Sequence, residues 1–399
     1  MSEKVVVRMA PSPTGNLHIG SVRNVLFNFL FARQNNGTFI LRIDDTNTER
    51  STKEYEKNIL DAVDWLGLKY DKLYRQSERG EIYKKYLNQL LENGHAYVSQ
   101  EVPTEENTRT EVIRFKNPNK KVSFEDTLRG TLEFDTTDLK DFVIAKSVDE
   151  PLYHLASVID DHDMGITHII RGDDILSSTP RQLLILEAIG AKIPSYTHVP
   201  LVLSPDRAKL SKRHGATAVT DYRDQGYLPQ AILNYLALLG WNPGTEQEIF
   251  TLDELIKVFD VKQINLSGAA FDEKKLDWVN KEHIKLLPPE EQRKLLLKSI
   301  ESEPYMVGEP DLDLSKINWK ENSNDDTLNW LEEVKKVIEA DGSVMDYAEK
   351  VGKGNVLWPL RYALTGVMAS PDPITLIEIL GKGKSLERLE KAIIALSNA

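Results

Sequence analysis

The sequence contains no cysteine, and this absence excludes several kinds of site. Without thiols the chain can form neither a disulfide framework nor a thiolate-bound zinc site or iron–sulfur cluster, so histidine and carboxylate side chains are the remaining metal ligands. The chain also lacks an apolar run of membrane-spanning length, and MSEKVVVRMAPSP at its start lacks the charged and apolar blocks of a secretory signal. We therefore expect a cytoplasmic protein with no membrane segment.

Positive charge is in the minority, because 50 lysine and arginine residues face 62 aspartate and glutamate residues, for a net charge of -12. This balance argues against indiscriminate binding to nucleic acid, although it permits a local basic surface on an acidic body. We find no internal repeat and no long low-complexity tract. The 399 residues, of which 41% are hydrophobic, are enough for two or three globular domains.

The segment RMAPSPTGNLHIG (residues 8–20) lies between an expected strand, Val5–Val7, and an expected amphipathic helix that begins near Ser21. Its prolines stiffen the turn, while Gly15 and Gly20 permit close approach of the backbone to a ligand. A helix that starts here directs unpaired N–H groups and the positive end of its dipole into the space above the strand, which suits phosphate. The alternative is a Pro- and Gly-rich connection without a ligand.

The rest of the chain predicts an α/β protein. The strand TFILRIDD follows the first helix, so the chain begins with a βαβ unit and a parallel sheet, whose ligands bind at the carboxyl ends of its strands. Helices are expected at Thr52–Leu66 and in YLNQLLENGHAYV, and residues 99–150 read as short strands. Alternating strands and helices return at residues 152–190, and the chain is mostly helical beyond Pro194. The segment EPDLDLSKINWKENSNDD reads as a linker or irregular segment.

A second charged motif, KLSKRHG, follows the strand-like HVPLVLS. Lys209 and Lys212 flank Ser211, and Arg213 is adjacent, so this turn could neutralise a polyphosphate. Taken alone, the motif is more typical of a solvated charge cluster. The motif indicates a phosphate-binding site only if it acts together with the turn at residues 8–20.

Together the two segments resemble the two signatures of class I aminoacyl-tRNA synthetases, and the longer match is to bacterial glutamyl-tRNA synthetases. This resemblance spans nearly the whole chain, with its motifs in the family's order. The segments that carry it are APSPTGNLHIG, LRIDDTNTERS, DWLGL, YHLASVIDDHDMGITHIIRGDD, STPRQLL, KLSKR, GYLPQAILNYLALLGW, FDEKKLDWVN, PLRYALTG and LGKGKSLERLEKAI.

The resemblance implies a Rossmann-like, parallel-sheet class I catalytic domain followed by a mainly helical region. The two halves of the catalytic domain are expected at residues 1–98 and 151–190. A shortened β-rich module that binds the tRNA acceptor end is expected between them at 99–150. A stem-contact domain with the KLSKR motif would occupy 191–287, and a shortened helical anticodon-binding domain 288–399. The stretch VSQEVPTEENTRTEVI is shorter than the family's usual insert and lacks cysteine, so we expect fewer contacts to tRNA.

The resemblance also assigns residues to ATP. His18, Lys209 and Lys212 are the expected catalytic residues, because attack of a carboxylate on the α-phosphate spreads negative charge over phosphoryl oxygens that fixed donors can stabilise. The full expected ATP-binding set is Gly15, His18, Gly20, Ser21, Asp174, Lys209, Ser211 and Lys212. Mg²⁺ should accompany ATP and bridge its phosphates with few protein ligands.

Glutamate needs an arginine for its side-chain carboxylate and an acid near its ammonium group. By family position the expected residues are Arg8, Ala10, Ser12, Asp44, Tyr153 and Arg171. A structural ion pair with Asp173 or Asp174 is the alternative role for Arg171. Many family members carry glutamate where this chain has Asp44, and LRIDDTN is also how the related glutaminyl enzymes read.

Three further groups have competing interpretations. His154, Asp160, Asp161 and His162 lack the ligand spacing of a closed metal site, so we expect packing roles and no metal. Arg361 is the expected tRNA contact, with capping of a helix as the alternative. Trp330 and Trp358 are expected to pack in a core, although aromatic side chains also stack on single-stranded bases.

The implied activity is glutamate–tRNA ligation by a monomer, with L-glutamate, ATP and tRNA(Glu) as substrates. The alternatives are a glutaminyl-tRNA synthetase, a paralogue that glutamylates a modified tRNA base, and a non-catalytic tRNA-binding protein. The helical region from Pro288 argues against the second, and His18, Lys209 and Lys212 argue against the third.

If Lys212 stabilises the departing pyrophosphate, Lys212→Ala should lower turnover far more than affinity for ATP, because the stabilised charge develops in the transition state. Steady-state kinetics with ATP as the varied substrate measure both quantities. An equal loss in both, or no loss, would count against this role.

Overall fold

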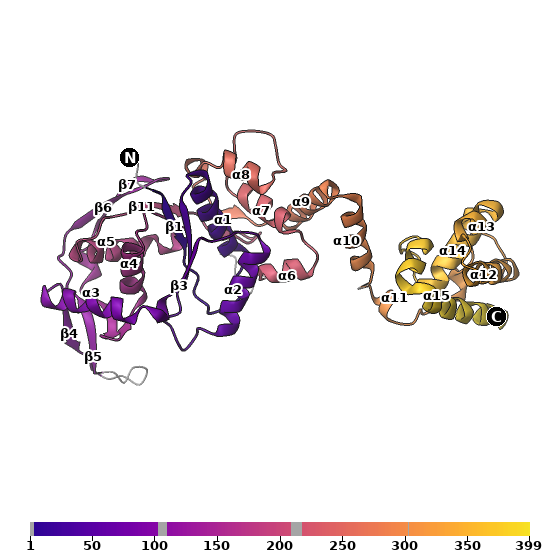
Figure 1. The fold of residues 1–399 in the computed structure, drawn as a ribbon, viewed down its shortest axis with the longest axis horizontal. Coiled ribbons are helices and arrows are strands. Elements are labelled where there is room, and N and C mark those ends of the chain that lie inside the picture. Colours follow the sequence, from indigo (N-terminus) through magenta and orange to yellow (C-terminus); the bar gives the residue numbers. More distant parts are fainter. Residues whose placement is uncertain (1–3, 103–109, 209–217, 302) are drawn as a thin grey trace. The chain divides into compact units, whose positions relative to one another are not determined.

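The chain divides into two compact units, Met1–Lys285 and Leu286–Ala399. They were analysed in a computed structural model, which describes residues 4–102, 110–208, 218–301 and 303–399. Figure 1 shows mixed strands and helices in the first unit and helices in the second. Each unit contains its own cluster of buried apolar side chains, so each is described by itself.

A parallel sheet forms the centre of the first unit. Its strands lie in the order β3-β2-β1-β10-β11, where the backbone N–H of Thr167 donates to Val6 O at 2.9 Å and brings β1 beside β10. Val6 pairs with Thr38, and His168 pairs with Ser195. The strands are β1 (Val6–Met9), β2 (Thr38–Ile43), β3 (Lys72–Arg75), β10 (His168–Gly172) and β11 (Ser195–Val199).

Helices cover both faces of this sheet, because successive strand residues point to opposite sides and both sides are apolar. Val7 and Ile170 pack in one buried cluster, and Ile40 and Ile169 in the other. The first cluster includes residues of α1 (Ile19–Gln34), α2 (Lys53–Trp65), α7 (Pro229–Leu238) and α8 (Leu252–Val258). The second includes residues of α3 (Gly80–Glu92), α4 (Tyr153–Asp163) and α5 (Thr179–Ala188).

The first two helices begin close to where the sequence predicts them, and side-chain caps explain why. His18 is the N-cap of α1, and its ring accepts a hydrogen bond from Ser21 N at 3.2 Å. Thr52 caps α2 in the same way by accepting from Tyr55 N at 3.2 Å. Each cap satisfies a backbone donor that the first turn of a helix leaves unpaired.

The strands of residues 99–150 divide between two sheets. β4 (Ala96–Gln100), β5 (Glu111–Phe115), β8 (Phe142–Ser147) and β9 (Glu150–Pro151) form an antiparallel sheet. β6 (Lys121–Asp126) and β7 (Gly130–Asp135) instead form a hairpin that joins the parallel sheet, where Asp126 pairs with Tyr196 of β11. The hairpin therefore extends the central sheet, and β11 itself continues that sheet past residue 190.

Short elements complete the first unit. They are β12 (Val202–Leu203), β13 (Ala269–Ala270), α6 (Val219–Asp224) and α9 (Glu273–Leu286), with 3-10 turns η1 (Gln76–Glu78), η2 (Thr137–Leu139), η3 (Asp173–Ser178) and η5 (Val261–Gln263). β12 pairs with β13, and Ala218 forms an isolated bridge with His18.

The second unit is helical within its described residues. It contains α10 (Pro289–Glu301), α11 (Pro304–Val307), η6 (Leu314–Lys316), α12 (Asn324–Glu339), α13 (Val344–Val351), α14 (Lys353–Thr365) and α15 (Pro373–Ser397). The segment EPDLDLSKINWKENSNDD is irregular around η6, but a linker role is wrong. Its Ile317 is fully buried in the helical core, and Trp319 lies 5.4 Å from Trp358 of α14 between ring centroids.

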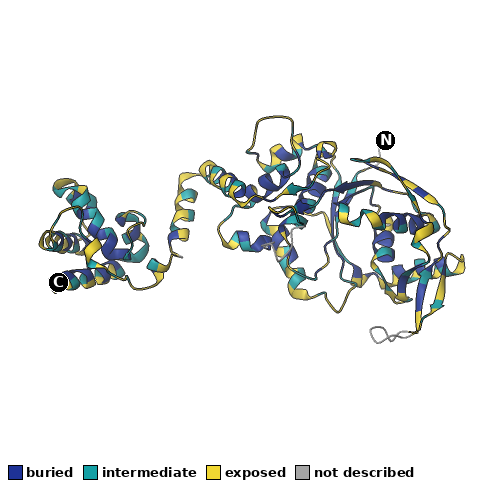
Figure 2. Cartoon of the chain, turned by 180° about the vertical axis from the view of Figure 1, so that it is seen from behind, coloured by how far each residue is buried: buried dark blue, intermediate teal, exposed yellow. Residues whose placement is uncertain are grey.

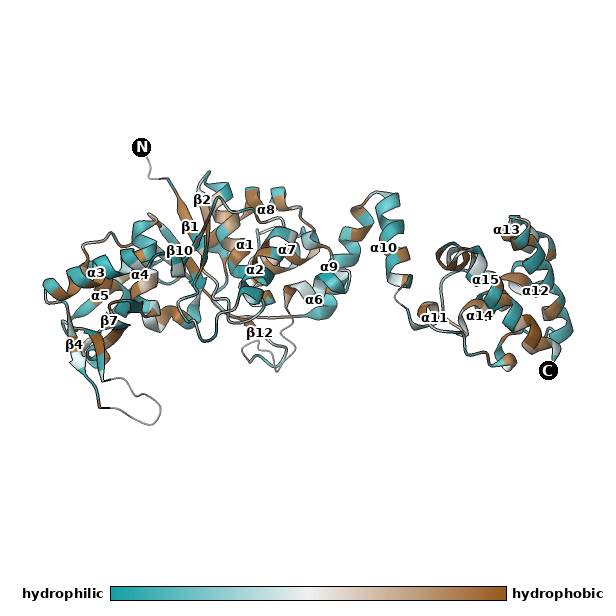
Figure 3. Ribbon diagram, turned by 60° about the horizontal axis from the view of Figure 1, so that its bottom comes forward, coloured by the Kyte–Doolittle hydropathy of each residue, from teal (hydrophilic) through white to brown (hydrophobic). Residues whose placement is uncertain are grey.

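Apolar side chains are concentrated on the packed faces of both units. Figure 2 shows buried residues along the inner sides of the helices and the strands, and Figure 3 shows hydrophilic and hydrophobic residues alternating along α10 and α12. Among the described residues, no helix combines the length and the apolar character that crossing a bilayer requires.

A glycine after α14 provides a test of this packing. Gly366 has φ +72°, and a Cβ there would lie 2.6 Å from Asp311 O. Gly366→Ala should lower the free energy of unfolding of the second unit by about 3 kcal/mol, from backbone strain plus steric overlap. The matched control is Gly94→Ala after α3, at φ +72° with no atom within 4 Å of the added Cβ, which should lower the free energy of unfolding of the first unit by only about 1 kcal/mol. Denaturant titration of both variants measures the difference, and equal losses would contradict the packing of residue 311.

Candidate active site

Charged side chains gather at the carboxyl ends of the central strands. Arg8 lies in β1, Asp44 directly follows β2, and Arg171 lies in β10, and all are buried. The sheet grows in opposite directions from the β1/β10 boundary, and such a point is where open α/β sheets bind ligands. The structure thus brings three of the predicted glutamate-binding residues to one edge of the sheet.

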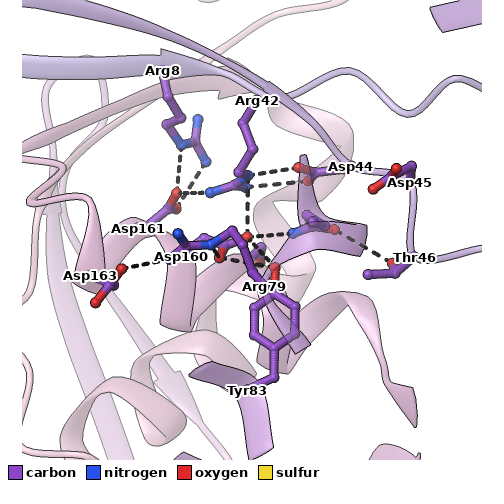
Figure 4. Close-up of polar contacts among 12 residues, drawn as sticks. Arg8, Arg42, Asp44, Asp45, Thr46, Arg79, Tyr83, Asp160, Asp161 and Asp163 are labelled. Atoms are coloured by element: carbon purple, nitrogen blue, oxygen red, sulfur yellow. Dashed lines mark hydrogen bonds and ion pairs between the residues drawn. The ribbon is translucent and has the colours of Figure 1, made fainter. Parts of the chain in front are cut away.

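Arg42 is the centre of this group and is completely buried. Its Nε and Nη2 donate to the two carboxylate oxygens of Asp44 at 2.7 and 3.3 Å. Its Nη1 donates to Asp161 Oδ1 at 2.7 Å, and Arg8 holds the same carboxylate through Nε at 3.0 Å and Nη2 at 3.2 Å. Figure 4 shows Arg8 and Arg42 converging on Asp161. Asp161 is therefore shared by two arginines.

Asp160 precedes Asp161 in α4 and also belongs to the group around Arg42. Its oxygens accept hydrogen bonds from Arg79 Nε at 2.6 Å and from Gln76 Nε2 at 2.7 Å, and the Tyr83 hydroxyl lies 2.9 Å from Oδ2 (Figure 4). Arg42 Nε is 3.5 Å from the same carboxylate. These contacts tie α3 and α4 to β2, and they satisfy the carboxylate in a site from which water is excluded.

Within this group the buried charges balance. The cations are Arg8, Arg42 and Arg79, and the buried anions are Asp44, Asp160 and Asp161, so three positive charges face three negative charges. Asp163, which also pairs with Arg79, has a side chain that is 39% exposed and is not counted among the buried charges. A buried ion group is tolerated when its charges are paired and hydrogen-bonded, as they are here.

The two aspartates on Arg42 have opposite pKa shifts. Burial raises the pKa of Asp44 to about 6, despite the attraction of Arg42. Burial would also raise the pKa of Asp161, but the charges of Arg8 and Arg42 hold that pKa below its ordinary value. Asp161 is thus firmly ionised, whereas Asp44 takes up a proton under mildly acidic conditions.

Arg171 differs from Arg8, Arg42 and Arg79 because its hydrogen-bond partners are neutral. Nη1 donates to Gln182 Oε1 at 2.8 Å, Nη2 to Thr179 Oγ1 at 2.8 Å and Nε to His198 Nε2 at 3.1 Å. Burial lowers the pKa of Arg171. Among the described residues Arg171 forms neither alternative ion pair, with Asp173 or with Asp174, and Asp173 pairs with Arg129 at 3.1 Å. Three of the five guanidinium N–H groups are used, so two can bind a ligand.

A second set of predicted residues surrounds a cavity of about 130 Å³ beside the start of α1. Its lining includes His18, Gly20, Ser21 and Asp174, all predicted to bind ATP, together with Leu201. His18 reaches this wall as the cap of α1, with Nε2 2.9 Å from Ser21 Oγ. The N-terminal turn of the helix and the cavity therefore lie together, as an anion-binding turn requires.

Arg23 and Asn24 also line this cavity, and the sequence motifs did not single them out. Arg23 is almost fully buried and donates to the backbone oxygens of Leu239, at 2.9 Å, and Pro200. Burial lowers the pKa of Arg23 to about 10. This side chain ties α1 to the Pro200 turn that forms the opposite wall of the cavity.

The remaining predicted residues are placed less centrally. Ser12 is exposed and accepts Thr14 N through its backbone oxygen at 2.9 Å, while Ala10 and Gly15 are half-buried in the same turn. Tyr153 begins α4 and is 38% exposed, so its ring is accessible. Lys209, Ser211 and Lys212 lie outside the described residues. Ala218, the first described residue after them, pairs with His18.

In the second unit, Arg361 lies against an aromatic pair. Its guanidinium is 4.7 Å from the ring centroid of Trp358, and Nη2 donates to Met368 O at 2.9 Å. Trp319 lies 5.4 Å from Trp358 between centroids, and Lys320 Nζ lies 5.4 Å from the ring of Trp319. Arg361 thus binds a backbone carbonyl just after α14 and also belongs to a cationic and aromatic surface.

Comparison with known proteins identifies the family of this chain. The family described as tRNA synthetases class I (E and Q), catalytic domain, matches residues 4–109 and 101–278. The chain belongs to this family. The family described as anticodon binding domain matches residues 292–393. The predicted Rossmann-like class I fold with a helical anticodon-binding region is therefore confirmed.

Its relatives match most or nearly all of the chain. The chain is 47% identical to a glutamate–tRNA ligase of Aquifex aeolicus over 72% of this chain and 68% of the relative. It is 38% identical to glutamate–tRNA ligase 2 of Fervidobacterium nodosum over 99% and 97% of the two chains. Among solved structures, a glutamate tRNA ligase from Elizabethkingia meningosepticum in complex with its amino acid is similar with a TM-score of 0.75 and 32% identity, covering 99% of this chain and all of that one.

Sequence reasoning missed part of this synthetase site. Asp160 and Asp161 were expected to have packing roles, but they hold Arg8, Arg42 and Arg79. Two adjacent acids inside the apolar helix ASVIDDHD were the available signal, because buried carboxylates need cationic partners. Among the described residues, no three histidine or acidic side chains are grouped so that they could hold a metal ion.

Removal of Arg42 should expose the dependence of this site on charge balance. Arg42→Leu leaves three buried carboxylates with fewer cations, so the free energy of unfolding should fall by about 3–5 kcal/mol at pH 8. The lost cation also raises the carboxyl pKa values in the folded state. Carboxyl groups with a raised pKa in the folded state favour folding at low pH, and this contribution is lost as pH rises. The free energy of unfolding that Arg42→Leu loses should therefore be smaller at pH 5 than at pH 8.

Urea denaturation at pH 5 and pH 8 measures both effects. The control is Lys121→Ala, which removes an exposed ion pair with Glu133 (2.8 Å) and should leave the midpoint unchanged. A variant as stable as the parent, or a deficit independent of pH, would contradict the buried charge group.

Proposed function

We propose that this synthetase is a glutamate–tRNA ligase that forms glutamyl-adenylate from L-glutamate and ATP and transfers glutamate to the terminal adenosine of tRNA(Glu). The observation that carries the proposal is the buried Arg171 with neutral partners, in a chain whose relatives are named glutamate–tRNA ligases. Its uncompensated charge at the carboxyl edge of the sheet calls for an anionic group on the substrate.

Charge balance favours glutamate over glutamine in this site. The Arg8, Arg42 and Arg79 group is neutral, so Arg171 leaves one positive charge in the pocket. Free glutamate carries two carboxylates and one ammonium, a net charge of about -1 at neutral pH, whereas glutamine is neutral overall. Arg171 can present its two remaining N–H groups to the side-chain carboxylate, and glutamine would leave the guanidinium uncompensated.

The other residues of the amino-acid site have complementary roles in this proposal. Asp44, ionised above about pH 6, would attract the ammonium group, and Arg8 and Tyr153 would border the substrate. Ala10 and Ser12 would contact it from the turn after β1. The bond from Arg42 fixes the Asp44 carboxylate, so its position does not depend on the substrate.

ATP would bind in the cavity beside α1. His18, Gly15, Gly20 and Ser21 would hold its phosphates, and Asp174 would lie near the nucleoside. A glutamate carboxylate oxygen would attack the α-phosphorus and pyrophosphate would leave, with Lys209, Ser211 and Lys212 on its departing side. The adenosine hydroxyl of tRNA would then attack the carbonyl carbon and release AMP. The pairing of Ala218 with His18 supports this placement of the lysines.

Mg²⁺ would accompany ATP. The described residues offer no group of three acidic or histidine ligands for it, so phosphate oxygens and water would supply most of its coordination. No step assigned to the residues of this chain depends on a protein-bound metal.

For tRNA, the match of residues 292–393 to an anticodon-binding domain supports contact with the anticodon through the second unit. The surface formed by Trp319, Lys320, Trp358 and Arg361 combines a ring face with cations, which suits an unstacked base beside phosphate. We assign residues 99–150 to the acceptor end and 191–287 to the stem. A monomer in the cytoplasm remains our expectation.

Exchange of labelled pyrophosphate into ATP tests the activity. We expect exchange that depends on glutamate and on added tRNA, and far less with glutamine. Exchange with glutamine alone would identify a glutaminyl enzyme, and no exchange with either would favour a non-catalytic tRNA-binding protein.

The same assay tests Arg171. Arg171→Met should lower kcat/KM for glutamate by about a hundredfold or more, because a buried charged hydrogen-bond partner is lost, while the low activity with glutamine changes little. Arg33→Met, which removes a partly exposed ion pair with Asp71 (2.9 Å), is the control and should match the parent. A parallel loss with both amino acids would contradict recognition of the carboxylate by Arg171.

A further inference from the structure

The hairpin of β6 and β7 reaches the amino-acid site through one buried carboxylate. Asp126, the last residue of β6, accepts the backbone N–H of His198 at 2.9 Å and lies 2.8 Å from His198 Nδ1, both through Oδ2. Its Oδ1 accepts Leu128 N at 3.0 Å and Arg129 N at 3.1 Å, which closes the turn. Both side chains are fully buried, so water does not compete for these bonds.

His198 connects this carboxylate to Arg171. Arg171 Nε is 3.1 Å from His198 Nε2, and a guanidinium can only donate, so Nε2 must be the unprotonated nitrogen. The ring proton then resides on Nδ1, where Asp126 accepts it. Burial also lowers the pKa of His198, which agrees with a neutral ring. The carboxylate thus selects the tautomer that can accept from Arg171.

The ring is held in place by its neighbours. It stacks on Tyr196 with centroids 5.7 Å apart and an interplanar angle of 6°, and Arg171 lies 5.3 Å from the centroid of Tyr196. Thr179 Oγ1, which accepts from Arg171 Nη2, is 3.1 Å from His198 Nε2. The guanidinium therefore has few orientations available.

This arrangement orients the guanidinium of Arg171 without neutralising its charge. A carboxylate in direct contact with Arg171 would orient it but would also neutralise it and compete with the substrate. Here the negative charge of Asp126 lies beyond the imidazole, so it strengthens the acceptor while the guanidinium keeps its charge for a ligand.

We infer that Asp126 and His198 are positioning residues that set the orientation of Arg171 and, through it, the selection of glutamate over glutamine. The inference rests on the proposed function, because it gives Arg171 the substrate carboxylate. It also gives the β6–β7 hairpin a part in amino-acid recognition in addition to any contact with tRNA.

The test compares Asp126→Asn with Asp135→Asn in the full chain, by glutamate-dependent pyrophosphate exchange with tRNA present. Asp135 lies at the other end of the hairpin, where its carboxylate accepts Thr137 N at 2.9 Å and the Thr137 hydroxyl at 2.6 Å. Asp126→Asn should raise KM for glutamate about tenfold or more, with kcat and KM for ATP within about threefold of the parent. The preference for glutamate over glutamine should fall by a similar factor, and Asp135→Asn should change none of these.

His198→Phe keeps an aromatic ring on Tyr196 but removes the acceptor for Arg171. It should therefore also raise KM for glutamate while kcat and KM for ATP stay near the parent values, even if Asp126→Asn fails to fold. If Asp126 acts through His198, Asp126→Asn should add no further rise in KM when His198 is already phenylalanine. An unchanged KM for glutamate in either single variant, or equal changes in KM for glutamate and for ATP, would overturn the inference. Failure of the parent protein to activate glutamate would instead overturn the proposed function and remove the basis of the inference.

Discussion

The site depends on one fully buried guanidinium, that of Arg42, and on the aspartates around it. Arg42 comes from β2, Asp44 from the residues just after it, and Asp160 and Asp161 from α4, more than a hundred residues later in the chain. Asp44 and Asp161 together accept from Nε, Nη1 and Nη2 of this arginine, so its buried N–H donors are paired as well as its charge. Because Asp161 also holds Arg8 of β1, the same contacts align two strands and a helix at the edge where ligands bind.

This charge group gives Arg171 its significance. If the group around Arg42 carried a net charge, the charge at this edge of the sheet could not be assigned to Arg171 alone. With three cations matched by three buried anions, Arg171 and its neutral partners add one positive charge beside this group. Under the proposed function, specificity would follow from electrostatics, because glutamate would compensate the charge of Arg171 and an uncharged analogue would not. The orientation of that arginine is fixed before the substrate arrives, which limits the entropy lost on binding.

The sequence was most informative where local rules govern structure. The cap residues His18 and Thr52 mark the starts of two helices, and alternating apolar strands with intervening helices predict the parallel sheet. The rule that ligands bind at the carboxyl ends of parallel strands predicted the edge of the sheet, while the family resemblance predicted that Arg8, Asp44 and Arg171 act together there. The family motifs supplied the rest of the expected site.

Long-range partners were less accessible. ILRIDD around Arg42 reads only as a strand, and nothing local states that Asp160 and Asp161 will meet it. The strand around Asp126 likewise gives no sign that it joins β11 rather than the sheet of β4 and β5. The stretch around Ile317 read as a linker or irregular segment, and its burial in the core could not be predicted because it depends on helices elsewhere in the chain. Such pairings arise from tertiary packing, which periodicity and composition do not encode.

The most direct test is a crystal structure of the protein with bound glutamate. The account predicts that the side-chain carboxylate contacts the free N–H groups of Arg171, while Thr179, Gln182 and His198 keep their contacts with the guanidinium and Asp161 remains paired with Arg8 and Arg42. A glutamate whose side-chain carboxylate binds elsewhere, or an Arg171 that has turned to pair with a protein carboxylate, would contradict it.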